Sequence, residues 1–385
     1  MAPQSQMQNR HWIVQFLRDN WLFIAFVGAM IVLPHAIGWF TDSSPFGVPR
    51  GSRIIMRGRS AFWQSIMIEV FVLSILVMSY NLMFGFTGVI SFGHALFFGL
   101  GGYTIGLFWQ YTEIDVNLAL FLGLVTTIVI TGVVGFLIGL VSLRLRGIYF
   151  AIFTLGVAEL VWIYVSRWAY TGGEDGFSIS RLPTWIDPSQ SRLNLYYIAL
   201  ILFALTFIFI YLLVKSPTGS VFQAIRENEP RARAIGYNTL RYKLFSITVA
   251  SIMVGLAGML QAILNKKLGP ELFGVSHTVD ALLMSIIGGV GTFVGPVLGA
   301  SGLHITDVLL RDADITLDLL LFEINIGESW VLILGLIFIL TVMVFPYGIV
   351  GTIYRVRRWI SKRVRGDGQA TSAQASGEIK RAETQ

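Results

Sequence analysis

Residues 118–142 read LALFLGLVTTIVITGVVGFLIGLVS, a run without a single charged side chain. A helix needs about 20 apolar residues to cross the hydrocarbon core of a bilayer, so this run is long enough to do so. It is also far longer than an ordinary strand. The stretch therefore predicts a transmembrane helix.

The composition of the whole chain agrees with a membrane protein. Of its 385 residues, 55% are hydrophobic and 13% are charged, and the mean hydropathy is +0.70. A soluble domain is about 45–50% apolar and about 25% charged. These values exclude an ordinary soluble enzyme, a disordered protein and a nucleic-acid binder, despite the net charge of +6. The absence of cysteine excludes disulfides, zinc–thiolate sites and thiol nucleophiles.

Nine further apolar stretches resemble the first, and together they predict an all-α integral membrane protein with about ten transmembrane helices. The eighth and ninth are separated only by a glycine-rich turn, so they also fit a single re-entrant unit. The ten stretches are 21–40, 61–83, 89–109, 118–142, 147–168, 195–214, 244–264, 276–290, 292–310 and 329–350.

The distribution of basic residues predicts the orientation. With ten spans both termini lie on one side, and most of the 28 Lys and Arg residues lie on that side. Basic loops are usually cytoplasmic, so we expect both termini in the cytoplasm. The Arg-rich segment 41–60 opposes this trend. We expect a cytoplasmic segment (1–20), a transmembrane domain (21–350) and a basic cytoplasmic tail (351–385). The transmembrane domain is expected to carry an external loop (169–194) and a cytoplasmic loop (215–243). The basic residues of the tail are expected to bind lipid headgroups, and the tail is expected to be disordered after 366.

The chain has no recognisable motor of its own. The dipeptide Gly-Lys does not occur, which excludes a P-loop of the GxxxxGK[ST] type. No metalloprotease, calcium-loop or nucleophile-elbow motif is present either. Concentrative transport would therefore draw its energy from an ion gradient or from a separate ATPase chain, and we expect no cofactor bound by this chain.

The loop 215–243 is the most informative polar segment. Pro217 and Gly219 end the sixth span, and Ser220 is expected to cap a short helix that runs to about Asn228. A second helix is expected to begin at Glu229. The mixture of charged and apolar side chains suits docking into a groove on a partner. The pattern alone also fits a solvated loop at the lipid headgroups.

This loop carries a family resemblance. Residues 216–238, SPTGSVFQAIRENEPRARAIGYN, resemble the cytoplasmic coupling loop of the LivM-like branched-chain amino acid permeases of ATP-binding cassette (ABC) transporters. Ala232 and Gly236 match the general EAA-x3-G pattern of ABC importers, whereas Pro230 and Arg231 replace its leading Glu-Ala. Four more segments resemble the same family in order: 80–95 (YNLMFGFTGVISFGHA), 143–155 (LRLRGIYFAIFTL), 171–176 (TGGEDG) and 285–300 (SIIGGVGTFVGPVLGA).

The resemblance implies a partner set and a mechanism. Such permeases pair with a second homologous permease, two ABC ATPase subunits that use the ATP, and an external substrate-binding protein, all at the plasma (inner) membrane. The ATPases push on the coupling loop and alternate access to a central path for branched-chain or related small amino acids. The residues assigned to coupling are Ser216, Gly219, Phe222, Ala224, Ile225, Arg226, Glu227, Glu229, Ala232 and Gly236.

Two alternatives to this function remain open from the sequence. A permease for urea or a short amide belongs to the same transporter class, although such permeases carry a different outer loop from Thr171–Gly176. An ion-coupled secondary transporter that works alone is the alternative from another class.

The glycine-rich segment 85–95 is the candidate substrate path. Backbone that leaves a helix at membrane depth must be buried in protein or line a cavity. Tight helix packing by small residues explains the same glycines, and His94 and Glu159 each have a purely structural interpretation. The path candidates are Asn81, Gly88, Ser91, Gly93, His94, Thr154 and Glu159. A cytoplasmic turn, with either an inner-gate or a purely structural role, is expected at Gly288, Gly289, Gly291, Thr292, Gly295 and Pro296.

Overall fold

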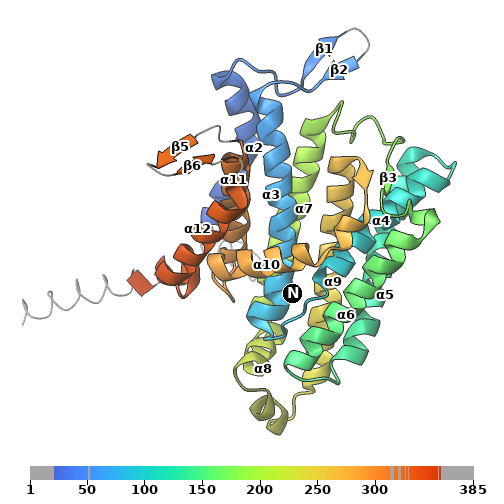
Figure 1. The fold of residues 1–385 in the computed structure, drawn as a ribbon. Helices are drawn as coiled ribbons and strands as arrows, with labels where there is room; N and C mark the ends of the chain where they lie inside the picture. The colour runs from blue at the N-terminus through green and yellow to red at the C-terminus, as the bar shows by residue number, and fades with distance from the viewer. Residues whose placement is uncertain are drawn as a thin grey trace, which may run out of the picture. The chain divides into compact units, whose positions relative to one another are not determined.

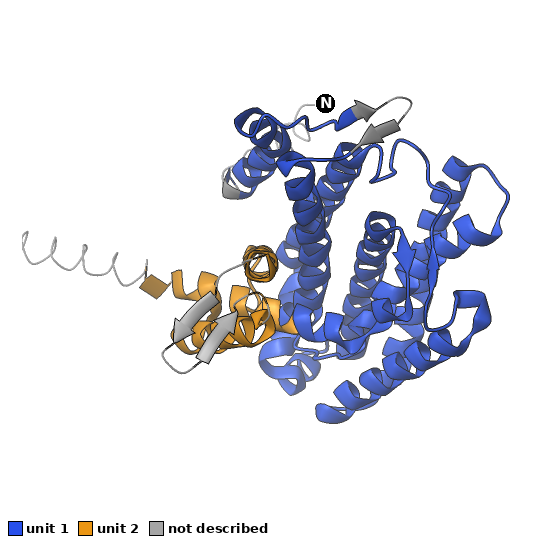
Figure 2. Ribbon diagram, turned by 45° about the horizontal axis from the view of Figure 1, so that its top comes forward, with its two compact units in different colours: residues 1–281 blue, residues 282–385 orange. Residues whose placement is uncertain are grey.

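The structure, a computed structural model, describes residues 21–50, 53–312, 316–319, 322–325, 327, 329–353 and 355–356. It divides into two compact units, residues 1–281 and 282–385, which are coloured separately in Figure 2. Each unit is described by itself. The predicted N-terminal segment 1–20 and the predicted disordered tail lie outside the described residues.

The first unit consists mainly of long helices. Its long helices are α2 (Trp21–Phe40), α3 (Arg59–Asn81), α4 (His94–Tyr111), α5 (Val116–Ser142), α6 (Ile148–Arg167), α7 (Arg192–Lys215), α8 (Pro217–Ala234) and α9 (Thr239–Asn265), and α10 (Val275–Gly288) continues into the second unit. Its short elements are the π-helix η1 (Leu82–Phe86), the 3₁₀-helices η2 (Ala169–Thr171) and η3 (Pro270–Phe273), and the strands β1 (Val48–Arg50), β2 (Arg53–Ile55), β3 (Phe177–Ser178) and β4 (Lys267–Leu268).

The second unit contains α11 (Gly295–Arg311), the antiparallel pair β5 (Thr316–Leu319) and β6 (Phe322–Asn325), and α12 (Trp330–Val344). Helices α11 and α12 contact each other. The Arg311 guanidinium lies 4.3 Å from the centre of the Trp330 ring, where α12 begins.

Helix α3 forms the core of the first unit and contacts α2, α7 and α9 (Figure 1). Most of its residues are buried, because helices pack on several of its faces and its sequence has no distinct polar face. Phe71 of α3 is fully buried, and its ring stacks on Phe203 of α7 with centroids 5.5 Å apart.

Helix α9 packs at close range against both α4 and α5, and glycine makes the approach possible. A Cβ atom on Gly101 of α4 would lie 1.9 Å from the carbonyl oxygen of Gly255 of α9. A Cβ atom on Gly258 would lie 1.9 Å from the carbonyl oxygen of Phe98. Small residues that let two backbones approach are typical of helix pairs in membranes.

Seven of the described helices are long and apolar enough to cross a membrane. All ten predicted stretches coincide with helices, but α4, α10 and α11 fall outside this set of seven. The result supports a multi-pass, all-α membrane protein. The number of ten spans and the side on which the termini lie stay predictions. Within the first unit, only a minority of the residues of α2, α5 and α6 are buried.

The loop between α6 and α7 folds back onto the segment that follows α9. Strand β3 pairs with β4, with Phe177 opposite Leu268. The same loop and segment are also joined by an ion pair: Lys266 Nζ, directly before β4, donates to both carboxylate oxygens of Asp187 at 3.0 Å. Burial opposes ionisation of Asp187, but hydrogen bonds from Ser189 and Lys266 outweigh it and hold its pKa below the usual value.

Candidate coupling and transport site

Helix α8 corresponds to the predicted coupling loop, and its first turn is built by Ser216. The Ser216 hydroxyl accepts a hydrogen bond from the Gly219 amide at 3.4 Å, and Pro217 occupies the first helical position. The predicted cap at Ser220 is therefore wrong, because Ser220 already lies inside the helix. The predicted break is present: Asn228 has non-helical angles (φ −158°, ψ 93°), and its side chain accepts from the Arg231 amide at 3.0 Å.

The apolar side chains of α8 are buried against the chain's own helices. Phe222 is fully buried, and Val221, Ile225 and Ala232 form a cluster with Tyr242 of α9. These side chains hold α8 in place and do not face a free surface. On the same helix, Gly219 is buried and Ala224 is half-buried.

The exposed surface of α8 and of the turn after it is mainly polar. It consists of Pro217, Ser220, Gln223, Arg226, Glu227, Asn228, Pro230, Arg231, Arg233, Ala234, Ile235, Gly236, Tyr237 and Asn238. Ile235, with 67% of its surface exposed, and Tyr237 are large apolar side chains that sequence reasoning did not single out. Their position beside Gly236, near the end of the segment that resembles the coupling loop, was the available signal.

Arg226 connects α8 to the end of α3. Its guanidinium Nη1 donates to the carbonyl oxygen of Gly85, in the π-helix η1. A Cβ atom on Gly88 would lie 3.1 Å from the Arg226 side chain, so glycine makes room for it, and Gly88 itself has a positive φ of 77°. Single π-helical turns widen the helix and occur often at functional sites. Helix α8 therefore touches the point at which α3 loses its regular form.

Glu229 is the centre of a cluster of charged groups. Its Oε1 lies 2.6 Å from Arg233 Nη2, and its Oε2 lies 2.6 Å from Lys243 Nζ of α9. The Thr239 hydroxyl also donates to Oε1, at 3.0 Å. Burial of Glu229 raises its pKa. The hydrogen bond and the positive charge of Lys243, together with hydrogen bonds from Thr239 and Arg233, outweigh the effect of burial, so the pKa of Glu229 is lower than usual. Glu227, two residues earlier and also assigned to coupling, is exposed and lies outside this cluster.

The chain between η1 and α4 leaves the helical path, as the glycines predicted. Two of its backbone amides bond to hydroxyl groups: the Phe92 amide donates to the Thr154 hydroxyl of α6 at 3.1 Å, and the Gly93 amide donates to the Ser91 hydroxyl of the segment itself at 3.1 Å. Thr87 Oγ1 lies 3.0 Å from Ser246 Oγ of α9. Most of this non-helical backbone is buried in protein, whereas Gly88 and Ile90 are exposed and line a cavity; both are conditions under which such backbone occurs at membrane depth.

The structure brings most path candidates together but encloses them. Asn81, Ser91, His94 and Thr154 are all buried. His94 Nε2 lies 3.4 Å from Ser79 Oγ, and the His94 ring meets Tyr80 edge-on at 5.0 Å between centroids. The His94 Nδ1 atom has no hydrogen-bond partner among the described residues. These contacts fit the structural interpretation of His94.

Glu159 stands apart from the other candidates. It lies on α6 and is half-buried, and its carboxylate forms no ion pair with a described residue. A charged side chain within an apolar span faces a bundle interior or a water-filled path in most membrane proteins. The α6 surface around it is exposed, including Ile152, Leu160 and Ile163.

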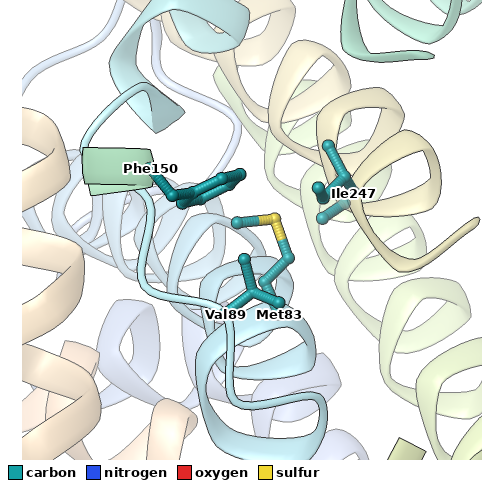
Figure 3. Packing of buried hydrophobic residues seen from close by; sticks show 5 residues of the cluster. Met83, Val89, Phe150 and Ile247 are labelled. Carbon is teal, nitrogen blue, oxygen red and sulfur yellow. The ribbon is translucent and has the colours of Figure 1, made fainter. Parts of the chain in front are cut away.

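A hydrophobic cluster borders two cavities near the irregular segment. Met83, Val89, Phe150 and Ile247 point toward one another in Figure 3, and Ala250 completes the cluster. Met83, Phe150 and Ile247 help to line a cavity of about 10 Å³ beside Ser91 and Thr154. Val89 and Phe150 also help to line a cavity of about 220 Å³ near α8. The cluster therefore contributes to the walls of both cavities, and Phe150 lines each of them.

The predicted glycine-rich turn lies in the second unit and connects α10, which ends at Gly288, to α11, which begins with Gly295-Pro296. The Thr292 hydroxyl donates to the Gly289 carbonyl at 2.7 Å and accepts from the Gly295 amide at 3.1 Å. Gly289 and Gly291 have φ values of 121° and 74°, which explains glycine there. A gating role for this turn stays a prediction.

Across the described part of the chain, no group of three or more His, Asp or Glu side chains could hold a metal ion.

Comparison with known proteins gives a consistent result. A family model described as "branched-chain amino acid transport system / permease component" matches residues 63–345. The chain is 31% identical to the high-affinity branched-chain amino acid transport system permease protein LivM of Salmonella typhimurium over 312 residues, 74% of this chain and 68% of that protein. It is 30% identical to the Escherichia coli protein of the same name, with the same shares covered.

A more distant relative is the probable branched-chain amino acid transport permease protein LivM of Methanocaldococcus jannaschii. Its identity is 26%, over 61% of this chain and 77% of that protein. No solved structure matches the chain significantly.

Proposed function

Because the chain belongs to the branched-chain amino acid transport permease family, we propose that it is one membrane-spanning subunit of an ABC importer. Its substrates are branched-chain or related small amino acids, which an external binding protein delivers. A second homologous permease completes the translocation path, and two separate ATPase subunits supply the energy. The complex lies in the plasma (inner) membrane with α8 and both termini in the cytoplasm, which the Lys and Arg distribution supports.

The ATPases dock on the exposed, polar surface of α8 and the turn that follows it. Arg231 and Glu227 provide charges on that surface, and Ile235 and Tyr237 provide apolar contacts. The absence of a P-loop in the sequence supports an external motor. A helix with one face packed on its own chain and the other face free is suited to docking in a partner's groove.

The contact between Arg226 and Gly85 carries the proposal. A push on α8 reaches the π-helix through this hydrogen bond and through the Glu229 cluster, which ties α8 to α9. Both paths lead to the hydrophobic cluster around Met83 and Val89. In this proposal, displacing that cluster opens a connection between the two cavities that it borders, so movement of α8 acts on the packing beside the irregular segment.

The half-buried Glu159 and the exposed face of α6 belong to the path in this proposal. A carboxylate there attracts the ammonium group of an amino acid, and the second permease covers the remaining α6 surface. Asn81, Gly88, Ser91, Gly93, His94 and Thr154 shape the irregular segment from inside the subunit.

Two variants of Arg226 test the transmission step. Arg226→Met keeps most of the side-chain stem but removes the donor, whereas Arg226→Lys keeps a charged donor. Loss of a hydrogen bond from a charged group costs about 1.5–3 kcal/mol. In the transporter reconstituted from both permeases, the ATPase subunits and the binding protein, we expect Arg226→Met to lower amino acid uptake per ATP hydrolysed by roughly 10-fold or more.

Arg226→Lys should retain more of this coupling ratio than Arg226→Met. Assembly of the purified complex is measured on both variants, so that loss of coupling is separated from loss of the partner. Equal coupling ratios in the wild type and in a fully assembled Arg226→Met complex would show that this contact does not transmit the stroke.

A further inference from the structure

The cavity of about 220 Å³ near α8 has the features of a small-molecule site. Its walls come from segments that are distant in sequence: the irregular chain after η1, the turn between α5 and α6, the second half of α8 and the start of α9. The lining residues are Gly88, Val89, Ile90, Leu143, Leu145, Arg146, Gly147, Phe150, Glu229, Arg233, Leu240 and Lys243.

The charged groups of the cavity favour an anion. Arg146, Arg233 and Lys243 face it together with a single carboxylate, that of Glu229. Glu229 is already paired with Arg233 and Lys243. The guanidinium of Arg146 forms no hydrogen bond or ion pair with a described residue, which leaves its planar pair of donors free for a carboxylate.

The rest of the wall favours a short aliphatic group. Val89, Leu143, Phe150 and Leu240 contribute apolar surface. A volume of about 220 Å³ corresponds to roughly seven water molecules at about 30 Å³ each, and valine has about as many non-hydrogen atoms. An apolar pocket with a few placed polar groups is the usual form of a ligand site.

We propose that this cavity binds a small branched aliphatic carboxylate, with the carboxylate on Arg146 and the side chain against Phe150 and Leu143. This inference rests on the proposed function for its ligand, because the transported amino acids are the members of this class that reach the cytoplasmic end. A bound amino acid would bridge the turn at Arg146 to the Glu229 cluster. It would thereby oppose movement of α8 and slow turnover as the amino acid accumulates inside.

The absence of cysteine from the chain allows a local test. Leu145→Cys places one thiol in the cavity wall, and Ile148→Cys places one on exposed surface three residues away, outside the cavity. The rate of maleimide labelling of the full chain in lipid nanodiscs is measured with and without valine. At valine ten times above its dissociation constant, we expect labelling of the Leu145→Cys thiol to slow about ten-fold, and labelling of the Ile148→Cys thiol to be unchanged.

Matched variants test the role of the charge. In the Leu145→Cys background, Arg146→Gln should weaken protection by valine about ten-fold or more. Arg144→Gln, on the same turn but outside the cavity, should leave protection as it was. Valinol, which has the same side chain and no carboxylate, should not protect.

Labelling that valine does not slow, equal protection in the Arg146→Gln and Arg144→Gln chains, or protection by valinol equal to that by valine would each overturn the proposed site. Unchanged ATP hydrolysis by the complete transporter at a saturating valine concentration would overturn the effect on turnover. The labelling assay needs neither ATPase nor uptake, so its failure leaves the proposed transport function untouched, and failure of uptake leaves the labelling result standing.

Discussion

Replacing Glu229 by Gln removes the negative charge that holds α8 to α9 while it preserves the size of the side chain. In the native chain this carboxylate accepts from Arg233, Lys243 and Thr239 at distances of 2.6, 2.6 and 3.0 Å. Glutamine offers only one acceptor oxygen, and its amide nitrogen would face a cation. Lys243, with 19% of its side chain exposed, loses its counter-charge.

The expected cost lies between two limits. An exposed ion pair contributes about 0–1 kcal/mol, and breaking a buried one costs about 3–5 kcal/mol. The side chains of Glu229 and Lys243 are 29% and 19% exposed, so solvent screens the pair only in part. We expect the free energy of local unfolding where α8 packs on α9 to fall by about 1–3 kcal/mol.

Hydrogen exchange measures this loss directly. In Glu229→Gln, amides in the second half of α8 should exchange roughly 5-fold to 100-fold faster than in the wild type, since exchange by local opening follows the free energy of that opening. The control is Glu227→Gln, which removes an exposed carboxylate two residues away. It should change exchange little.

The pH dependence of the wild type follows from the lowered pKa of Glu229. Because the native pKa is depressed, the contribution of the carboxylate is fully present above the usual carboxyl pKa of about 4.3, and it is lost as the pH falls through the lower native value. Exchange in α8 should therefore be insensitive to this group near pH 7. Equal protection in the Glu229→Gln and Glu227→Gln chains at pH 7 would refute the view that the cluster anchors α8.

Three other changes have defined outcomes. Gly101→Val places a side chain against the Gly255 carbonyl, where a Cβ would already lie 1.9 Å away; overpacking of about 1–3 kcal/mol or more should lower the thermal unfolding midpoint of the purified chain. Asp187→Asn removes the charged partner of Lys266. Loss of this partly exposed ion pair should lower the local stability by about 1 kcal/mol, so proteolysis of the loop between α6 and α7 should be faster. Ser216→Ala removes the helix cap of α8 at a cost of about 1 kcal/mol, and should raise exchange in its first turn only.

Sequence predicted the helices well because the hydrophobic pattern of each span is long and nearly uninterrupted. The expected family membership is confirmed. The start of the third stretch, predicted at residue 89, lies at His94, since the chain turns at Gly88 and then runs without helical structure to Gly93. The glycines marked an irregularity there, but hydropathy alone could not place its end.

The site was less accessible from sequence, because it depends on which residues meet in space. Ser216 and Ser220 both precede a helical turn, and only Pro217 at the first helical position distinguishes the true cap. Lys243 meets Glu229 across 14 residues of chain, a pairing without periodic signal. The apolar residues of α8 indicated a packing face, yet whether it met a partner or its own α9 was decided by tertiary structure.

The central claim is that this permease has no power stroke of its own and takes it from separate ATPase subunits through α8. The direct measurement is uptake of radiolabelled leucine into proteoliposomes that contain this chain and its second permease, with and without the ATPase subunits, binding protein and ATP. The account predicts concentrative uptake only when all components and ATP are present, and none with an imposed proton or sodium gradient alone. Concentrative uptake driven by an ion gradient, without any ATPase, would contradict it.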